Sequence, residues 1–354
     1  MKIMFNLLKK KKSIIQAYGT GAIPDSLDLR DRSYDEVVAG APLLSEEEWT
    51  RGFDIEQELD FKLPIKDQNY SQSCVGQAWA YYIGVLNLAE VKTYKEVSAK
   101  AIYSQIHFPG GGSYIREGAK LAVNWGALVE NVVKSYENNK PPSEEFMIDL
   151  SWKNEKADGL AKVLKAKEYR VINNKSSMDL FAMAIRDNWG IVGGLNVGNS
   201  PTWRTNEPKP TTREGGHCLY YGKFGVDELG KYIATPNSWG WRGKDNLHPD
   251  GWQKLRQDYF SDLFQFNPWT LLDKPNVEVN TVDPVIQKIL NANEKKIIIE
   301  GQGAGRKGIV INGRLRDIVK DREAVACLYG MANNNIGTTI STDIYNLLPK
   351  GGIF

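Results

Sequence analysis

Cys74 is the residue of this chain that is best placed to act as a nucleophile. It lies in "DQNYSQSCVGQAWA", residues 67 to 80, where a polar loop turns into a helix rich in Ala, Trp and Tyr. A thiol attacks well near neutral pH when its thiolate is stabilised. The start of a helix provides this through unpaired backbone N–H groups and the helix dipole. The stretch therefore predicts a reactive cysteine that is held ionised where the helix begins.

A nucleophilic thiol also needs a base, and the chain has three histidines. His107 in "SQIHFPGGG" and His248 in "NLHPDG" fall in loop-like stretches, which favours ordinary surface or packing roles. His217, in "EGGHCLYYGKFG", opens a predicted strand behind two glycines, where a rigid edge can hold a side chain toward a cleft. His217 is therefore the expected base.

Two further groups complete this chemistry. An Asn can hold an imidazole in one orientation by accepting its other N–H, and a neighbouring Trp can screen that bond from water. Asn237 and Trp239 in "ATPNSWGW" fit these two roles. Acyl transfer also needs hydrogen-bond donors for the oxyanion of its tetrahedral intermediate. The backbone N–H of Cys74 and the side-chain amide of Gln68, on the loop that enters the helix, are the expected donors.

The elements that must position these residues change type along the chain. Apolar residues at three- and four-residue steps predict helices over "SCVGQAWAYYIGVLNLAE", starting at Ser73 or Cys74, over "REGAKLAVNWG", and over "SSMDLFAMAIRDNWG", capped by Ser176 or Ser177. After Gly190, short apolar or alternating segments predict strands of an antiparallel sheet or barrel: "IVGGLNV", "HCLYYGKF", "KYIATPNSW" and "GWQKLR". Helices followed by strands indicate an α+β fold.

The chain is expected to have three parts. Residues 1–22 read as a basic N-terminal tail, because Lys9 to Lys12 interrupt a signal-like start and no cleavage site follows. Residues 23–275 form the main domain, and the Pro-rich stretch 267–284 predicts a linker. Residues 276–354 are a small α/β accessory unit, with strands joined by the glycine-rich "GQGAGRKG" and by "NG", and with a helix over "DREAVACLYGMANN". The glycine-rich stretch lacks the Lys-Ser/Thr ending of a phosphate loop, which favours a hairpin turn.

Composition excludes several classes of protein. The net charge of +2 gives no reason to expect nucleic acid as a partner, and no apolar run is long enough to cross a bilayer. Three cysteines do not make a disulfide framework, so a reducing setting is expected, cytoplasmic or virion-associated. No His/Cys cluster has the spacing of metal ligands, so neither a metal nor another cofactor is expected.

At this point the residues match a known family. "PIKDQNYSQSCVGQAWA", "GGHCLYYGKFG" and "YIATPNSWGWRGK", followed by "DGW", resemble in order and spacing the three active-site blocks of papain-like cysteine peptidases. "IPDSLDLRD" resembles the mature N-terminus of that family, and "FPGGGSYIREGAKLAVNWGALVE" its glycine pair followed by a helix. The blocks span roughly residues 23 to 260, and several blocks in the correct order are more specific than a lone Cys and His.

The resemblance implies two lobes, one mostly helical and one built on a β-barrel, with a cleft between them. It implies that Cys74 is the nucleophile, His217 the general base and acid, Asn237 the orienting residue and Gln68 the oxyanion donor. A substrate-binding surface is implied at a further set of residues: Gly111, Gly112, Gly216 and Trp239. The glycine pair would bind the backbone of an extended peptide, and the Trp would shield the Asn.

The sequence departs from the family pattern at several points. Ser71 and Val75 stand where the family usually has a cysteine and an aromatic residue. Residues 32–61 are an insertion that we expect to cover part of the surface or of the cleft. The region before Ile23 is too short for a long inhibitory pro-segment, so activation by its removal is not expected. Cys218 is interpreted as a small buried hydrophobe.

Three functions remain open from the sequence. The leading one is a cysteine endopeptidase that cleaves a peptide or protein substrate through a thioester on Cys74. The second is a papain-like module of a structural or assembly protein, such as a virion protein, in which residues 276–354 bind a docking partner. The third keeps the thiol chemistry but directs it at peptidoglycan cross-links or acyl transfer.

Overall fold

The computed structural model describes residues 19–137, 140–198, 201–210, 214–240, 251–266 and 268–272, and the backbone of five strands in the C-terminal part. The chain divides into two compact units, Met1–Pro275 and Asn276–Phe354. The same position separates the main domain from the accessory unit that we proposed from the sequence.

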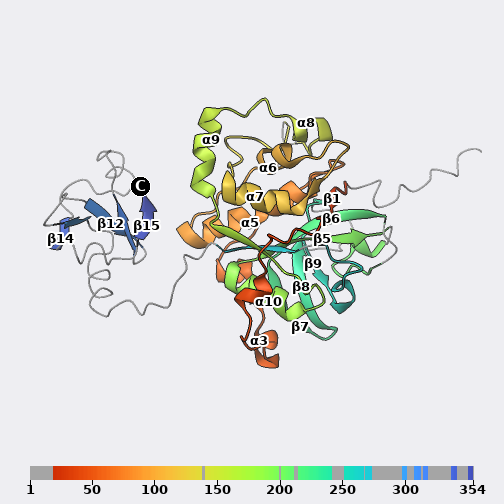
Figure 1. The fold of residues 1–354 in the computed structure, drawn as a ribbon. Helices are drawn as coiled ribbons and strands as arrows, with labels where there is room; N and C mark the ends of the chain where they lie inside the picture. The colour runs from red at the N-terminus through yellow and green to blue at the C-terminus, as the bar shows by residue number, and fades with distance from the viewer. Residues whose placement is uncertain are drawn as a thin grey trace, which may run out of the picture. The chain divides into compact units, whose positions relative to one another are not determined.

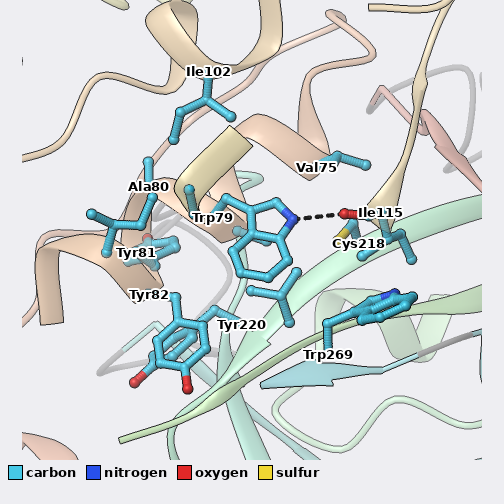
Figure 2. Close-up of a cluster of buried hydrophobic side chains, with 14 of the residues drawn as sticks. Val75, Trp79, Ala80, Tyr81, Tyr82, Ile102, Ile115, Cys218, Tyr220 and Trp269 are labelled. Carbon is cyan, nitrogen blue, oxygen red and sulfur yellow. Dashed lines mark hydrogen bonds between the residues drawn. The ribbon is translucent and has the colours of Figure 1, made fainter. Parts of the chain in front are cut away.

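Helix α5 (Cys74–Val91) is the centre of the first unit. All of its residues from Cys74 to Leu86 are buried, as expected for a helix surrounded by core. It lies against helices α6 (Ala99–Ile106) and α7 (Ile115–Asn124) and against the sheet. Figure 2 shows its aromatic side chains in this core, with the Trp79 indole N–H donating to the Ile115 carbonyl at 3.0 Å.

The predicted helix starts are confirmed. Helix α5 begins at Cys74 with Ser73 as its N-cap residue. Helix α10 (Met178–Asn188) has Ser177 as its N-cap, whose hydroxyl accepts the Leu180 N–H. Shorter helices complete the set: α2 (Tyr34–Val37), α3 (Glu46–Arg51), α4 (Ile55–Glu58), α8 (Glu144–Ile148), α9 (Glu155–Ala161), and the 3₁₀ turns Lys162–Leu164, Pro201–Arg204 and Gln257–Tyr259.

The strands form two four-stranded antiparallel sheets where the sequence predicts a sheet or barrel. One has the order β4 (Glu168–Val171), β10 (Trp269–Leu272), β5 (Ile191–Val197) and β6 (Gly215–Tyr221). The other has the order β2 (Phe53–Asp54), β7 (Lys223–Asp227), β8 (Gly230–Pro236) and β9 (Trp252–Leu255). Each of the four segments predicted as strands after Gly190 contains a strand, but "HCLYYGKF" covers the end of β6 and the start of β7, and "KYIATPNSW" extends beyond the end of β8 at Pro236. In Figure 1, α6, α7 and α8 lie on one side of this unit, and β7, β8 and β9 on the other.

A short parallel pair joins the N-terminal segment to the helical side. Strand β1 (Ala22–Ile23) pairs with β3 (Ser113–Tyr114), so that Ala22 lies opposite Ser113. The sequence assigns residues 19–22 to a tail, and this is wrong because they belong to the folded unit. Residues 1–18 of the predicted tail lie outside the described part.

The insertion over residues 32–61 covers β7 and α10. It supplies α2, α3, β2 and α4, and Phe53 of β2 pairs with Phe224 of β7. The side chain of Trp49 is fully buried, meets the Phe224 ring edge to face at 5.3 Å, and donates its indole N–H to Asp179 at 2.7 Å. The insertion therefore extends the core around the second sheet.

The second unit contains one five-stranded sheet. Its order is β14 (Ile336–Ile340), β11 (Ile297–Glu300), β12 (Lys307–Ile311), β13 (Arg314–Asp317) and β15 (Lys350–Ile353). Strands β11, β12 and β13 pair antiparallel in succession, as the two predicted hairpins require. The predicted helix over "DREAVACLYGMANN" lies outside the described residues.

Candidate active site

The four residues expected to carry out chemistry come from separate elements. Cys74 is the first residue of α5, His217 lies on β6, Asn237 directly follows β8, and Gln68 lies in the loop before α5. Cys74, His217 and Gln68 are fully buried, and Asn237 is 8% exposed.

His217 is held by a chain of amide hydrogen bonds. Its Nε2 lies 2.9 Å from Asn237 Oδ1. The Asn237 side chain in turn donates from Nδ2 to Gln253 Oε1 at 2.7 Å. Gln253 Nε2 donates to the backbone carbonyls of Trp203 and Thr205 at 3.0 and 2.9 Å. The sequence did not point to Gln253, although it follows the "DGW" block directly.

This chain of bonds fixes the imidazole tautomer. Backbone carbonyls only accept, so Gln253 must turn its amide nitrogen to them and its oxygen to Asn237. Asn237 must then turn its oxygen to His217, and Nε2 of the imidazole carries the proton. Nδ1 keeps the lone pair of a base, and this buried atom has no hydrogen-bond partner among the residues described. The imidazole therefore has a free basic nitrogen.

Two tryptophans enclose the imidazole. Trp239 stacks on the His217 ring with the centroids 4.3 Å apart and the planes 21° apart. Trp203 meets both rings edge to face. The predicted role of Trp239 as a shield fits this geometry.

Cys74 lies next to β6, the strand that carries His217, but its sulfur forms no hydrogen bond with the His217 imidazole. The backbone of Cys218, the residue after His217, lies close enough to the Cys74 thiol to lower its pKa. His217 Nδ1 has no partner within the described part of the chain, which includes Cys74, so no Sγ–Nδ1 hydrogen bond is formed in this state. Cys218 itself is buried in the hydrophobic core that also contains Cys74, as its interpretation as a small hydrophobe requires.

Burial controls the protonation of both groups. It raises the pKa of the Cys74 thiol to about 11, although the backbone N–H groups of Cys218 and Gly21 act against it. Burial also lowers the pKa of His217 to about 4, against the effect of the hydrogen bond to Asn237. The expectation of an ionised thiol is therefore wrong for this state. At pH 7 the thiol is protonated and the imidazole is neutral.

The Gln68 side chain is oriented as a donor. Its Oε1 accepts the Ser238 hydroxyl at 2.6 Å, which turns Nε2 toward the other side. Nε2 donates to the Ser71 carbonyl and to the Gly19 carbonyl, both at 2.9 Å. The amide predicted to bind an oxyanion thus already binds a backbone carbonyl oxygen of the N-terminal segment.

Residues 19–22 lie across the site. The Gly19 carbonyl also accepts the Trp239 indole N–H at 3.2 Å, and the Gly19 N–H donates to the Asn69 carbonyl at 3.0 Å. The Gly21 carbonyl accepts the Ser113 N–H at 2.8 Å, and the Gly21 backbone lies close enough to the Cys74 thiol to lower its pKa. Residues 19–22 therefore contact the loop before Cys74, Trp239 and the strand that follows the glycine pair.

The glycines predicted to bind substrate lie next to residues 19–22 or to the loop before Cys74. A Cβ atom at Gly112 would lie 2.4 Å from the Gly21 carbonyl oxygen, and one at Gly216 would lie 2.1 Å from the Ala22 carbonyl oxygen. At Gly111, a Cβ would meet the Gln72 side chain at 2.4 Å. These contacts place all three glycines beside the loop of the nucleophile or the N-terminal segment.

Glu144 links the two loops that border the site. One carboxylate oxygen accepts the Gln72 N–H at 2.6 Å, and the other accepts the Tyr103 hydroxyl at 2.6 Å. The Tyr103 oxygen accepts the Gly112 N–H at 3.1 Å. No sequence signal pointed to Glu144, because its partners Gln72 and Tyr103 come from two other segments. The carboxylate therefore ties the loop before Cys74 to the glycine pair.

The described residues contain no group of three or more His, Cys, Asp or Glu side chains arranged to hold a metal ion. Cys74 and Cys218 are both free thiols, and Cys327 lies outside the described part. Among the helices that the structure describes, none has the length and apolar character needed to cross a membrane.

Comparison with solved structures identifies the fold. Xylellain, a cysteine protease from Xylella fastidiosa, matches with a TM-score of 0.56 and 23% identity, over 77% of this chain and 100% of that one. The proform of the ragweed pollen cysteine protease Amb a 11 matches with a TM-score of 0.53 and 14% identity, over 73% of this chain and 75% of that one. ProCathepsin B S9 from Trypanosoma congolense matches with a TM-score of 0.52 and 12% identity, over 73% and 87% of the two chains.

No family model matches the chain, and no curated protein matches it. The likeness therefore rests on structure at low sequence identity. It bears out the resemblance seen in the active-site blocks and the α+β class. The chain has the fold of the papain-like cysteine proteases.

Proposed function

We propose that the protein is a cysteine peptidase that hydrolyses peptide bonds through a thioester on Cys74. Cys74 Sγ attacks the scissile carbonyl carbon while its proton passes to His217 Nδ1. His217 then gives this proton to the leaving amine as the C–N bond breaks. Water, deprotonated by His217, attacks the thioester, and the proton returns to the sulfur as the acid product leaves. Gln68 Nε2 and the Cys74 N–H stabilise the oxyanion in both halves.

The observation that carries the proposal is the amide chain that ends at His217. It puts the proton on Nε2 and leaves the buried Nδ1 without a partner among the residues that the structure describes. A buried polar atom without a partner costs free energy, and Nδ1 is one of several described atoms that carry this cost. A lone pair held in this way suits a base that meets its proton donor during the reaction.

The fold supports this proposal without deciding it, because one fold serves many functions. The solved structures with this fold are described as cysteine proteases. The substrate we propose is an extended peptide or protein segment whose backbone binds along Gly111, Gly112 and Gly216, with Trp239 at the border. The four catalytic side chains complete the reaction without a cofactor.

Labelling with a thiol-directed epoxide at neutral pH tests the proposal. We expect prolonged incubation of the full chain to modify Cys74 selectively over Cys218 and Cys327, and His217→Ala to remove this selectivity. Cys74→Ala should abolish labelling and peptide hydrolysis, while Cys218→Ala should keep both. Equal labelling of all three thiols only after unfolding would show a silent site.

The second compact unit, Asn276–Phe354, favours an additional role in docking. We propose that it attaches the peptidase to a larger assembly in a reducing setting, cytoplasmic or virion-associated. Size-exclusion of the full chain with and without extracts of such assemblies, compared with a chain that ends at Pro275, tests this role. Equal elution of both chains in all mixtures would contradict it.

A further inference from the structure

We propose that Lys66 is a positioning residue whose buried ammonium group holds the Gln68 amide and the Trp239 indole in place. The inference deepens the proposed function and rests on it, because it concerns the geometry of the same site. Lys66 lies two residues before Gln68, and its side chain is 1% exposed. Burying a charged group costs free energy, so its place beside the site needs a physical reason.

The Lys66 side chain and N–H are bound to the helical side of the domain. Lys66 Nζ donates to Glu96 Oε1 at 2.9 Å and to the Val97 carbonyl at 3.4 Å, just before α6. The Lys66 N–H donates to the Tyr81 hydroxyl of α5 at 2.7 Å, and Nζ lies 5.4 Å from the centre of the Tyr81 ring. Residue 66 is therefore fixed to α5 and to the segment before α6.

The backbone that follows this anchor pairs with the segment after β8. Residues 66–68 run antiparallel to residues 238–240, with Asp67 opposite Trp239, and we call this pairing the ladder. Its hydrogen bonds run from the Gly240 N–H to the Lys66 carbonyl at 3.0 Å, from the Gln68 N–H to the Ser238 carbonyl at 2.8 Å, and from the Ser238 hydroxyl to Gln68 Oε1 at 2.6 Å. The anchor at Lys66 thus extends to both strands of the ladder.

The ladder carries two groups of the candidate site. Gln68 Nε2 is the proposed oxyanion donor, and Trp239 stacks on the His217 ring. Asn237, which binds His217 Nε2, directly precedes the ladder. A shift of the ladder would therefore move the oxyanion donor and the support of the imidazole together. Misplacing such groups by about 1 Å can cost about 100-fold in rate.

An apolar side chain could fill the space of the Lys66 side chain at a lower cost. Replacing a buried ion pair by apolar groups is often neutral or stabilising, because charges lose their hydration on burial. A charge-assisted hydrogen bond has a defined length and direction, which apolar contacts lack. We therefore attribute the Lys66–Glu96 pair to the position of residue 66 and not to stability.

The test compares Lys66→Met with Lys100→Met in the full chain. Lys100 is a buried lysine of α6 that pairs with Asp149 at 3.1 Å, away from the ladder. The side chains of this pair are 7% and 44% exposed, against 1% and 35% for Lys66 and Glu96, which makes Lys100 a matched control. Both variants lose a buried ammonium group, and both leave a carboxylate that water reaches.

Three quantities are measured: hydrogen exchange at the Gln68 and Gly240 amides, kcat and KM for a peptide, and the free energy of unfolding in urea. We expect Lys66→Met to raise exchange at both amides about tenfold or more, because the ladder loses its anchor. We expect its kcat to fall by about 10- to 100-fold with a small change in KM. Lys100→Met should keep wild-type exchange at these amides and wild-type kcat.

Changes at Glu96 provide a conservative variant and a disruptive one. Glu96→Gln keeps an oxygen that can accept from Lys66 Nζ, so kcat should stay close to that of the wild type. Glu96→Ala removes the acceptor and should lower kcat in the same direction as Lys66→Met. If Lys66→Met fails to fold, Glu96→Ala answers the same question, because the Glu96 side chain is partly exposed.

The outcomes separate this inference from the proposed function. Wild-type exchange at the ladder and wild-type kcat in a folded Lys66→Met variant would overturn the positioning role. Equal losses of kcat in Lys66→Met and Lys100→Met would also overturn it, since a general loss of stability would then explain both. Faster exchange at the ladder in Lys66→Met, together with no peptide hydrolysis by the wild type, would support the anchor and contradict the peptidase.

Discussion

Gln253 is predicted to control catalysis without touching the substrate, and Gln253→Leu tests this. The change removes the acceptor of the Asn237 amide and the donor to the Trp203 and Thr205 carbonyls, so three buried hydrogen bonds are lost. Each buried group left without a partner costs about 1–3 kcal/mol. We therefore expect the free energy of unfolding to fall by about 3 kcal/mol or more.

The same change should disturb the His217 tautomer. Without Gln253, the Asn237 amide loses the bond that fixes its orientation, and a flipped amide would donate to Nε2 and move the imidazole proton to Nδ1. This form cannot accept the Cys74 proton. We expect kcat to fall by about tenfold or more with a small change in KM, because a positioning bond worth about 1.4 kcal/mol corresponds to a factor of ten.

Nitrogen-15 NMR of the imidazoles reads the tautomer directly, and the chain has only three histidines. Urea unfolding and steady-state kinetics give the other two quantities. Gln257→Leu is the matched control, since among the described residues that exposed side chain bonds to the Ser176 carbonyl alone. If Gln253→Leu keeps the Nε2–H tautomer and the wild-type kcat while losing only stability, the positioning argument is wrong.

Two further variants test the surroundings of the site. Burial raises the pKa of Asp25 to about 6, above its ordinary 3.8, so its contribution to stability is full below pH about 4 and is lost as the pH rises through 6. Asp25→Asn should therefore remove a decrease of up to about 3 kcal/mol in the free energy of unfolding between pH 4 and 7, measured by urea unfolding. A pH profile equal to that of the wild type would contradict this. Glu144→Ala should raise KM more than it lowers kcat and cost about 2 kcal/mol of stability, since it releases Gln72 and Tyr103. Exposed Glu145→Ala is its control, and equal kinetics for the two would refute the link.

Local chemistry in the sequence was enough to predict the elements that carry the site. The apolar spacing predicted the start of α5 at Ser73 or Cys74 and the cap of α10 at Ser176 or Ser177, and the structure has the start at Cys74 and the cap at Ser177. These features depend on residues within one or two turns of each other, so a linear pattern contains them. The order of the active-site blocks likewise led to the fold, which the solved structures share.

Tertiary structure determines the protonation and the hydrogen bonding of the site. A helix start stabilises a thiolate, yet burial raises the pKa of Cys74 to about 11, and burial is created by segments from both ends of the domain. Gln253, Glu144 and Gly19 acquire their roles from partners far away in the sequence. The residue types at these positions do not predict such contacts, because a Gln, a Glu or a Gly is equally common in a solvated loop. Only folding removes water from the site and brings the hydrogen-bond donors and acceptors together. Burial and these bonds then determine the protonation states of Cys74 and His217.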